Sequence, residues 1–242
     1  MGITRVAAAL VRSGVSEARR LVGVVERRGR ERGNTGFLLA ALLCVAVLFA
    51  SVLDHTTLGR HWIDACCGER DSDPLPAWLA KLPGSLVAPA RDLPVWGSLV
   101  QLAVVFGIAE AAVGRRLALL PALAGHVVST VATRVCLLIG PGHLLGLPPA
   151  VGRVLDTGPS GATVALTAYL TIVLRCPVLG TLAAGGLAVA SLTHSDLAAR
   201  EHITAWVVGA ACGVVHLIVL RHATRRATPA ELGSRTALEP SR

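Results

Sequence analysis

The amino-acid sequence predicts an all-α, polytopic membrane protein whose chain crosses the bilayer as a bundle of six helices. Of its 242 residues, 53% are hydrophobic and only 16% are charged, whereas about a quarter of the residues in a soluble domain are charged. The mean hydropathy is +0.62. The apolar runs are long and continuous and do not alternate with a period of two residues, so they indicate helices and not the strands of a β-barrel.

A basic segment, residues 1–35, precedes the first apolar run. It carries eight arginines from Arg5 to Arg32, and its apolar residues recur at roughly helical spacing. This pattern is typical of an amphipathic helix that lies on a membrane surface. A solvated basic tail is the alternative, and the sequence does not decide between the two.

The six predicted spans lie within residues 36–221. The first, FLLAALLCVAVLFASVL, is close in length to the ~20 residues that a bilayer requires. A polar tail, residues 222–242, is predicted to be disordered. The predicted spans are residues 37–53, 95–113, 117–139, 160–174, 177–192 and 201–220.

The distribution of arginine predicts a multi-pass protein of the inner (plasma) membrane with both termini in the cytoplasm. Cytoplasmic loops of membrane proteins carry an excess of Lys and Arg. Six spans place the following residues on one side: Arg5 to Arg32, Arg115, Arg116, Arg175, Arg221, Arg225 and Arg226. The formal net charge of +8 is therefore interpreted as a topology signal. No nucleic-acid motif accompanies it, so no nucleic-acid partner is predicted.

The loop 54–94 is predicted to lie at the outer membrane interface, because it holds Trp62, Trp78 and several prolines. Metal-ligand residue types occur there, but their spacing fits no standard metal site; they are His55, His61, Asp64, Cys66 and Cys67. We therefore expect no metal and no cofactor. The six cysteines form no recognisable disulfide framework and are expected to be reduced.

Several polar side chains inside the predicted spans are interpreted as structural. Glu110 near the inner end of the second span is expected to pair with Arg116. On the third span, His126, Thr130 and Arg134 share one helical face that must point into the bundle. A small transporter that uses this face as a polar path is a less favoured alternative, since no internal repeat or broken-helix pair supports it.

Two short motifs open the fourth and sixth spans, on the same outer side of the membrane. Ser160 follows a Gly158-Pro turn and precedes Gly161. His202 opens a helix whose small residues are Ala205, Gly209 and Gly213. These two strings resemble the GxSG and HxxGxxxG motifs of the rhomboid family of intramembrane serine proteases, with Ala205 in place of the first glycine of the second motif.

The resemblance implies that Ser160 is the nucleophile and His202 its general base, in a dyad that cleaves membrane-anchored proteins near the outer face. Small residues allow two membrane helices to approach closely. Those that are expected to bring the two helices together are Gly161, Ala165 and Ala168 on the fourth span and Ala205, Gly209 and Gly213 on the sixth.

The chain departs from the family at the oxyanion site. Rhomboid proteases usually carry an HxxxN pair on the second span, and residues 94–98 contain neither His nor Asn. Pro159 has no backbone N–H to offer. The remaining candidates for oxyanion or support roles are Ser98, Gly158, Gly161 and the amide of Ser160. An inactive pseudoprotease that binds transmembrane segments is therefore the main alternative, and the oligomeric state is left open.

A further motif, Asp156-Thr-Gly, resembles one loop of the aspartic proteases. Those enzymes require two such aspartates, and this chain places its single copy between membrane helices. Asp156 is instead expected to cap the helix that begins at Ser160.

Overall fold

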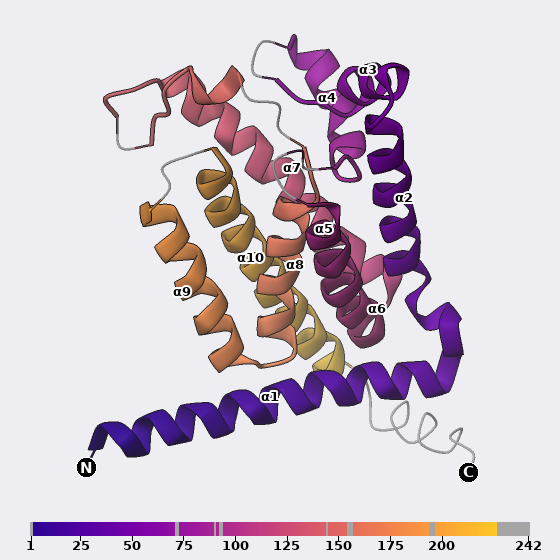
Figure 1. Ribbon diagram of the computed structural model, residues 1–242. Helices are drawn as coiled ribbons and strands as arrows, with labels where there is room; N and C mark the ends of the chain where they lie inside the picture. The colour runs from indigo at the N-terminus through magenta and orange to yellow at the C-terminus, as the bar shows by residue number, and fades with distance from the viewer. Residues whose placement is uncertain are drawn as a thin grey trace.

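The computed structural model describes residues 2–70, 73–89, 91, 94–143, 145–153, 157–193 and 197–226. Within these ranges the chain folds into helices and forms no strand, so the predicted all-α class is confirmed. Figure 1 shows the helices as a bundle, with a long helix lying across one end. Asp156 and the tail residues 227–242 lie outside the described residues, and residues 222–226 continue the last helix.

All six predicted spans are helical, and the predicted loop 54–94 contains two further helices. Their bounds are α1 (Gly2–Arg32), η1 (Gly33–Phe37), α2 (Leu38–Asp54), α3 (Thr57–Cys66), α4 (Leu75–Ser85), α5 (Val95–Gln101), η2 (Leu102–Phe106), α6 (Gly107–Val113), α7 (Arg115–Ile139), η3 (Val151–Arg153), α8 (Ser160–Val173), α9 (Pro177–Thr193) and α10 (Leu197–Arg226). The segments α5, η2 and α6 run on continuously, and η2 is a turn of π-helix within them.

Four helical segments are long and apolar enough to cross a membrane: Thr35–Asp54, Val95–Val113, Arg115–Ile139 and Leu197–Arg225. The other two predicted spans are also helical, but α8 and α9 have 14 and 17 residues. At ~1.5 Å per residue they reach about 21 and 26 Å, short of a ~30 Å hydrocarbon core. The structure therefore supports a membrane protein with four candidate spanning helices.

The centre of the bundle is α8, which lies between α7 and α10 (Figure 1). Eight of its residues are buried. Contact is closest around Ala165: a Cβ added at Gly125 of α7 would overlap the Ala165 methyl group, and one added at Gly209 of α10 would overlap the Ala165 carbonyl oxygen. Glycine on both neighbours therefore lets the three backbones pack together.

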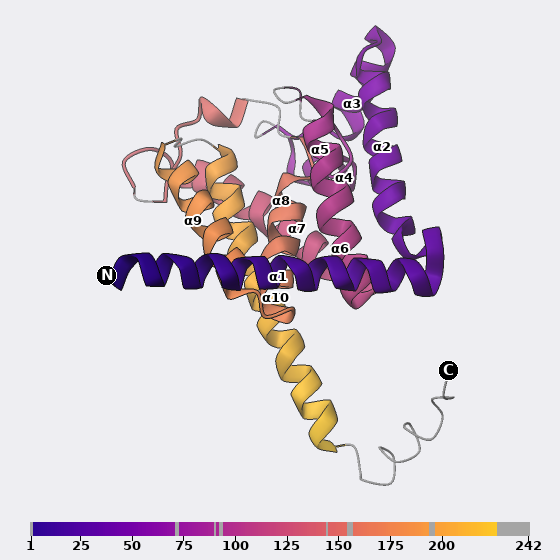
Figure 2. The ribbon, with the colours of Figure 1, turned by 60° about the horizontal axis from the view of Figure 1, so that its bottom comes forward.

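The basic segment forms α1, which lies across the end of the bundle formed by the α6–α7 and α8–α9 turns (Figures 1 and 2). Buried Glu17 accepts hydrogen bonds from the backbone N–H groups of Val178 and Leu179, at 3.1 and 2.9 Å. One turn later, Arg20 donates to the carbonyl oxygen of Arg175 at 3.1 Å. Helix α1 thus places a carboxylate at the start of α9 and a guanidinium at the end of α8, as the helix dipoles favour.

Glu110 also caps a helix, and its charged partner differs from the predicted one. Its carboxylate accepts from the backbone N–H groups of Leu39 and Ala40, at 2.8 and 3.2 Å, and from Arg115 Nε at 2.6 Å. The expected Glu110–Arg116 pair is therefore wrong. Gly114 turns the chain sharply, with φ of +82°, so that α7 begins at once and Arg115 is the residue that reaches back.

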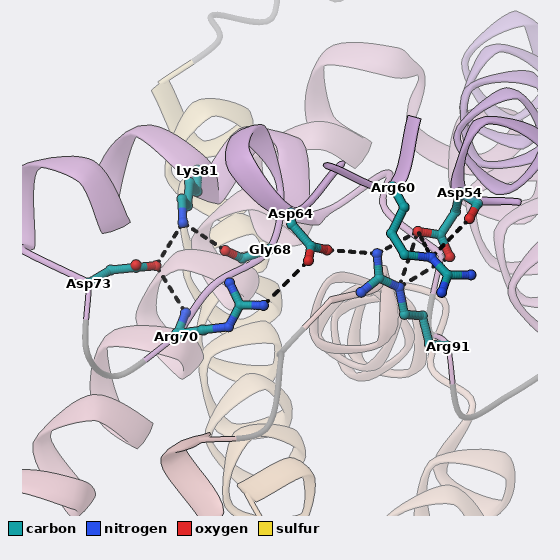
Figure 3. Close-up of polar contacts among 8 residues, drawn as sticks. All are labelled: Asp54, Arg60, Asp64, Gly68, Arg70, Asp73, Lys81 and Arg91. Atoms are coloured by element: carbon teal, nitrogen blue, oxygen red, sulfur yellow. Dashed lines mark hydrogen bonds and ion pairs between the residues drawn. The ribbon is translucent and has the colours of Figure 1, made fainter. Parts of the chain in front are cut away.

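At the opposite end, α3 and α4 are joined by a network of ion pairs (Figure 3). Arg91 bridges Asp54 and Asp64, and Lys81 pairs with Asp73 at 2.8 Å. Burial raises the pKa of Asp64, but hydrogen bonds from Arg91 and Arg70 outweigh it and hold that pKa below its ordinary value of 3.8. Burial likewise raises the pKa of Asp73, and the bond from Lys81 leads the contributions that lower it overall.

Glu17→Gln should detach α1 from the bundle, because it removes the charge that caps α9. We expect a loss of about 1–2 kcal/mol in unfolding free energy, or roughly 2–8 °C in the melting temperature of the purified protein. Glu26→Gln is the matched control, since Glu26 is exposed and pairs with Arg30 at 3.8 Å. Equal melting temperatures for the two variants would contradict the capping role.

Acid should weaken the network of Figure 3. A carboxyl group whose pKa is lowered by folding stabilises the fold above its ordinary pKa, and that contribution is lost as the pH falls through the lowered value. Melting temperatures of wild type and the Asp64→Asn, Asp73→Asn double variant should therefore differ at about pH 7 and converge towards about pH 2. A difference that stays constant over this range would contradict the assignment.

Candidate functional site

A cavity of about 230 Å³ lies at the end of the bundle remote from α1, and Ser160 and His202 both line it. Four parts of the chain contribute its walls. They are Gln101 and Val105 from α5 and η2, Ser160, Thr163, Val164 and Thr167 from α8, Ala183 and Leu187 from α9, and His202 and Trp206 from α10. The two residues singled out by the sequence motifs are thus brought to one place.

Ser160 is positioned by a turn that is fixed against α4 and the segment after it. Gly158 has φ of +128°, which L side chains rarely adopt, and its N–H donates to the Ser85 carbonyl oxygen at 3.0 Å. The Thr157 hydroxyl donates to the Pro89 carbonyl oxygen at 2.9 Å. Gly158 therefore shapes the turn that starts α8 and leaves the Ser160 side chain as the first polar group of this helix.

His202 lies near the start of α10 and is half-buried. Among the described residues no hydrogen bond joins its ring to the Ser160 hydroxyl, although both groups line the same cavity. The backbone carbonyl oxygen of Ser160 accepts a hydrogen bond from the Thr163 hydroxyl at 2.9 Å. A movement of the side chains is therefore required before the pair can exchange a proton.

Packing between α8 and α10 sets the positions of these two helix starts. Ala165, Ala168 and Ala205 are fully buried. Further along, a Cβ added at Gly213 would lie 2.8 Å from the Cβ of Ile172. The small residues predicted to pack the helices all lie in the core around α8, and the close contact extends over about two turns of α10.

Glu201, next to His202, is a buried carboxylate that the sequence analysis did not single out. Its Oε1 atom lies 3.3 and 3.4 Å from the hydroxyl oxygens of Ser129 and Thr130 on α7, and both hydroxyls are also within hydrogen-bond distance of the His126 carbonyl oxygen. A Cβ added at Gly161 would lie 2.8 Å from its Oε1 atom. Glu201 thus ties α10 to α7 and places its negative charge beside the first turn of α8. An acidic residue at the first position of a predicted membrane span was the signal that pointed to it.

Gln101 is the second residue that the sequence analysis missed. Its side-chain amide lies 3.3 Å from the Thr163 hydroxyl, measured from Oε1, and it lines the cavity. Ser98, the residue expected there, is buried one turn earlier and does not line the cavity. Gln101 is the only glutamine of the chain and interrupts an apolar run, which is the signal that could have identified it.

His126 lies away from the cavity and joins α7 to α4. Its Nε2 atom is 2.9 Å from the Ser85 hydroxyl and 3.2 Å from the Leu82 carbonyl oxygen. Further along the same face, Arg134 donates to the Asp73 carbonyl oxygen at 2.7 Å and covers the Trp78 ring at 4.9 Å. These contacts are structural and close the face against α4.

The described part of the chain contains no cluster of three His, Cys, Asp or Glu side chains that could hold a metal ion. Its cysteines are all free. The polar groups that line the cavity are the hydroxyls of Ser160, Thr163 and Thr167, the Gln101 amide, the His202 imidazole and the Trp206 indole N–H.

Comparison of the chain with protein-family models, with curated proteins and with solved structures gave no match. The function must therefore be inferred from the residues and geometry of the site.

Proposed function

We propose that this protein is a rhomboid-like intramembrane serine protease, with Ser160 as nucleophile and His202 as general base. The observation that supports it best is that these two residues, 42 positions apart in the sequence, line one cavity at the starts of two closely packed helices. Each motif alone is common, but a Ser and a His at adjacent helix starts are the arrangement that activation of a serine hydroxyl requires.

In the proposed reaction, neutral His202 takes the proton of the Ser160 hydroxyl as its oxygen attacks a peptide carbonyl carbon. The protonated imidazole then gives this proton to the leaving amine, and a water molecule hydrolyses the acyl-enzyme by the same route. Rotation of the two side chains brings the hydroxyl and the imidazole into contact. Such a change is common, because catalytic hydrogen bonds are often long or poorly aligned before substrate binds.

Gln101 supplies the oxyanion donor that the missing HxxxN pair would have provided. The Thr163 hydroxyl has a single proton and lies closer to the Ser160 carbonyl oxygen than to Gln101. The oxygen and nitrogen of a side-chain amide occupy equivalent positions, so a 180° rotation of the Gln101 amide exchanges them. With its NH₂ group towards Thr163, Gln101 keeps a second N–H for the substrate. The positive end of the α8 dipole adds to this stabilisation.

The depth of the site suits a substrate that arrives from the bilayer. Helix α7 has 25 residues and is about 37 Å long, whereas α8 reaches only about 21 Å. We place α8 and α9 as the remaining two of six membrane segments, with Ser160 below the outer surface of the bilayer. The cavity is flanked by α5–η2 and α9, between which a transmembrane polypeptide would enter. The π-helical turn η2 forms one side of this entrance.

A binding function without catalysis is the second candidate, and the position of Glu201 favours it. Its carboxylate lies beside Gly161, close to where an oxyanion would develop. A negative charge there opposes the charge that forms in the transition state. A pseudoprotease would keep the same cavity and use it to hold a transmembrane client.

Both candidates require the cytoplasmic termini that the arginine distribution predicts. Reporter fusions after Arg116, Arg175 and Arg226 should give cytoplasmic signals, and a fusion at Leu145 should give an outer signal. An outer signal at Arg175 would place α8 in the opposite orientation, and the site could not then lie at the outer face.

Labelling by a fluorophosphonate tests the proposed chemistry without knowledge of the substrate. Wild type should be labelled at Ser160, Ser160→Ala should give no label, and His202→Ala should lower the rate of labelling by at least ~10². Gln101→Ala should lower it by about 10²–10³. The matched control is Ser98→Ala, which should retain the wild-type rate because Ser98 does not line the cavity.

Melting temperatures of each variant must be measured beside the labelling, so that loss of fold is separated from loss of chemistry. Folded wild type that takes no label would overturn the protease proposal. Binding of a transmembrane peptide by the same unlabelled protein, abolished by Trp206→Ala, would then support the second candidate.

A further inference from the structure

At the end of the bundle where α1 lies, a second and larger cavity is rich in arginine. Its volume is about 600 Å³, and it lies between the C-terminal part of α1 and the α6–α7 turn. Arg28 and Arg32 contribute from α1, and Arg115 and Arg116 from the start of α7. Among the residues that the structure describes, no acidic side chain lines it. Its size is typical of a ligand site.

Three of these arginines have no carboxylate partner in the described part of the chain. Arg115 is engaged by Glu110 and by the Thr35 carbonyl oxygen. By contrast, Arg28, Arg32 and Arg116 form no ion pair there. The Nε atom of Arg28 is also buried without a hydrogen-bond partner within the described residues. An unpartnered buried donor costs free energy that a bound anion would recover.

Two neighbouring arginines of α1, by contrast, are paired with glutamates of the same helix. Arg27 lies 3.9 Å from Glu31, and Arg30 lies 3.8 Å from Glu26, each within α1 itself. The three unpaired guanidinium groups therefore converge on the α6–α7 turn without local neutralisation. Guanidinium groups bind phosphate oxygens through paired hydrogen bonds.

A helix start adds a second, independent attraction for an anion. The 25-residue α7 begins beside this cavity, after Gly114, and in the described part of the chain no side chain caps its first N–H groups. Uncapped N–H groups at a helix start bind phosphate and sulfate readily. The start of α7 and the three arginines thus act on the same space.

The remaining wall of the cavity is apolar, which favours a phospholipid over free inorganic phosphate as the bound molecule. Ala112, Val113 and Leu117 line it where two candidate spanning segments meet. This is the boundary between hydrocarbon and water, where lipid headgroups lie. We propose that the cavity binds the phosphate group of an anionic phospholipid, whose glycerol and acyl chains pack against the apolar wall and hold α1 against the bundle.

The experiment uses the purified full-length protein in a neutral detergent with phosphatidylglycerol, phosphatidylcholine or inorganic phosphate as the probe. Binding is measured by native mass spectrometry and by the rise in melting temperature. Phosphatidylglycerol should bind at least tenfold more tightly than the other two probes. The triple variant Arg28→Gln, Arg32→Gln, Arg116→Gln should weaken its binding about 100-fold, as expected for three basic groups at a membrane surface.

The matched control is Arg5→Gln, Arg12→Gln, Arg19→Gln, which removes the same charge from the far half of α1. It should change the dissociation constant less than about threefold, because general attraction is screened beyond ~10 Å. An equal loss in both triple variants would overturn the proposal and indicate attraction to the whole basic helix. Inorganic phosphate binding as tightly as phosphatidylglycerol would overturn the lipid assignment.

A single substitution guards against misfolding of the triple variant. Arg116 is exposed and forms no ion pair among the described residues, so Arg116→Glu should leave the melting temperature of the lipid-free protein unchanged. It should still weaken phosphatidylglycerol binding by more than tenfold. Unaltered binding in this folded variant would overturn the proposal.

Discussion

The contact between three helix backbones at Ala165 is the constraint on which the rest of this structure depends. Gly125 and Gly209 have no side chain to separate α7 and α10 from α8, and even one methyl group on either would overlap Ala165. Helices in a bilayer gain little from apolar burial between them and associate instead through close packing. This contact fixes α8 at the centre, and it brings the starts of α8 and α10 to the same end of the bundle.

Buried glutamates provide the second principle of the fold. Glu17 caps α9, Glu110 caps α2, and Glu201 lies beside the start of α8. Each comes from a different helix than the one whose start it meets, so each also connects two elements. In a low-dielectric interior, free N–H groups at a helix start are costly and a nearby carboxylate stabilises them. These three buried glutamates thus stabilise the starts of helices in this apolar chain.

At the Ser160 cavity, the buried carboxylate of Glu201 supports the structure but opposes the proposed chemistry. Glu201 links α10 to α7 through Ser129 and Thr130, and thereby holds His202 near the start of α8. The same carboxylate opposes an oxyanion at that helix start. In the proposed function, the neutral side-chain amide of Gln101, from α5, is the donor that offsets this effect. The two proposed functions, cleavage and binding without catalysis, therefore differ in the balance between the Glu201 carboxylate near Gly161 and the Gln101 amide near Thr163.

The sequence by itself determined the helical class, the places of the long apolar helices and the two residues that line one cavity, because apolar periodicity and Gly-Pro-Ser turns act locally. It did not determine which polar groups pair across the bundle. Arg115 and not Arg116 reaches Glu110 because the turn at Gly114 lets α7 begin at Arg115, two residues earlier than expected. Gln101, and not the expected Ser98, lines the cavity because the position of α5 against α8 decides which turn of α5 faces it. Such contacts join residues far apart in the chain, and only the tertiary packing of the helices sets their distances.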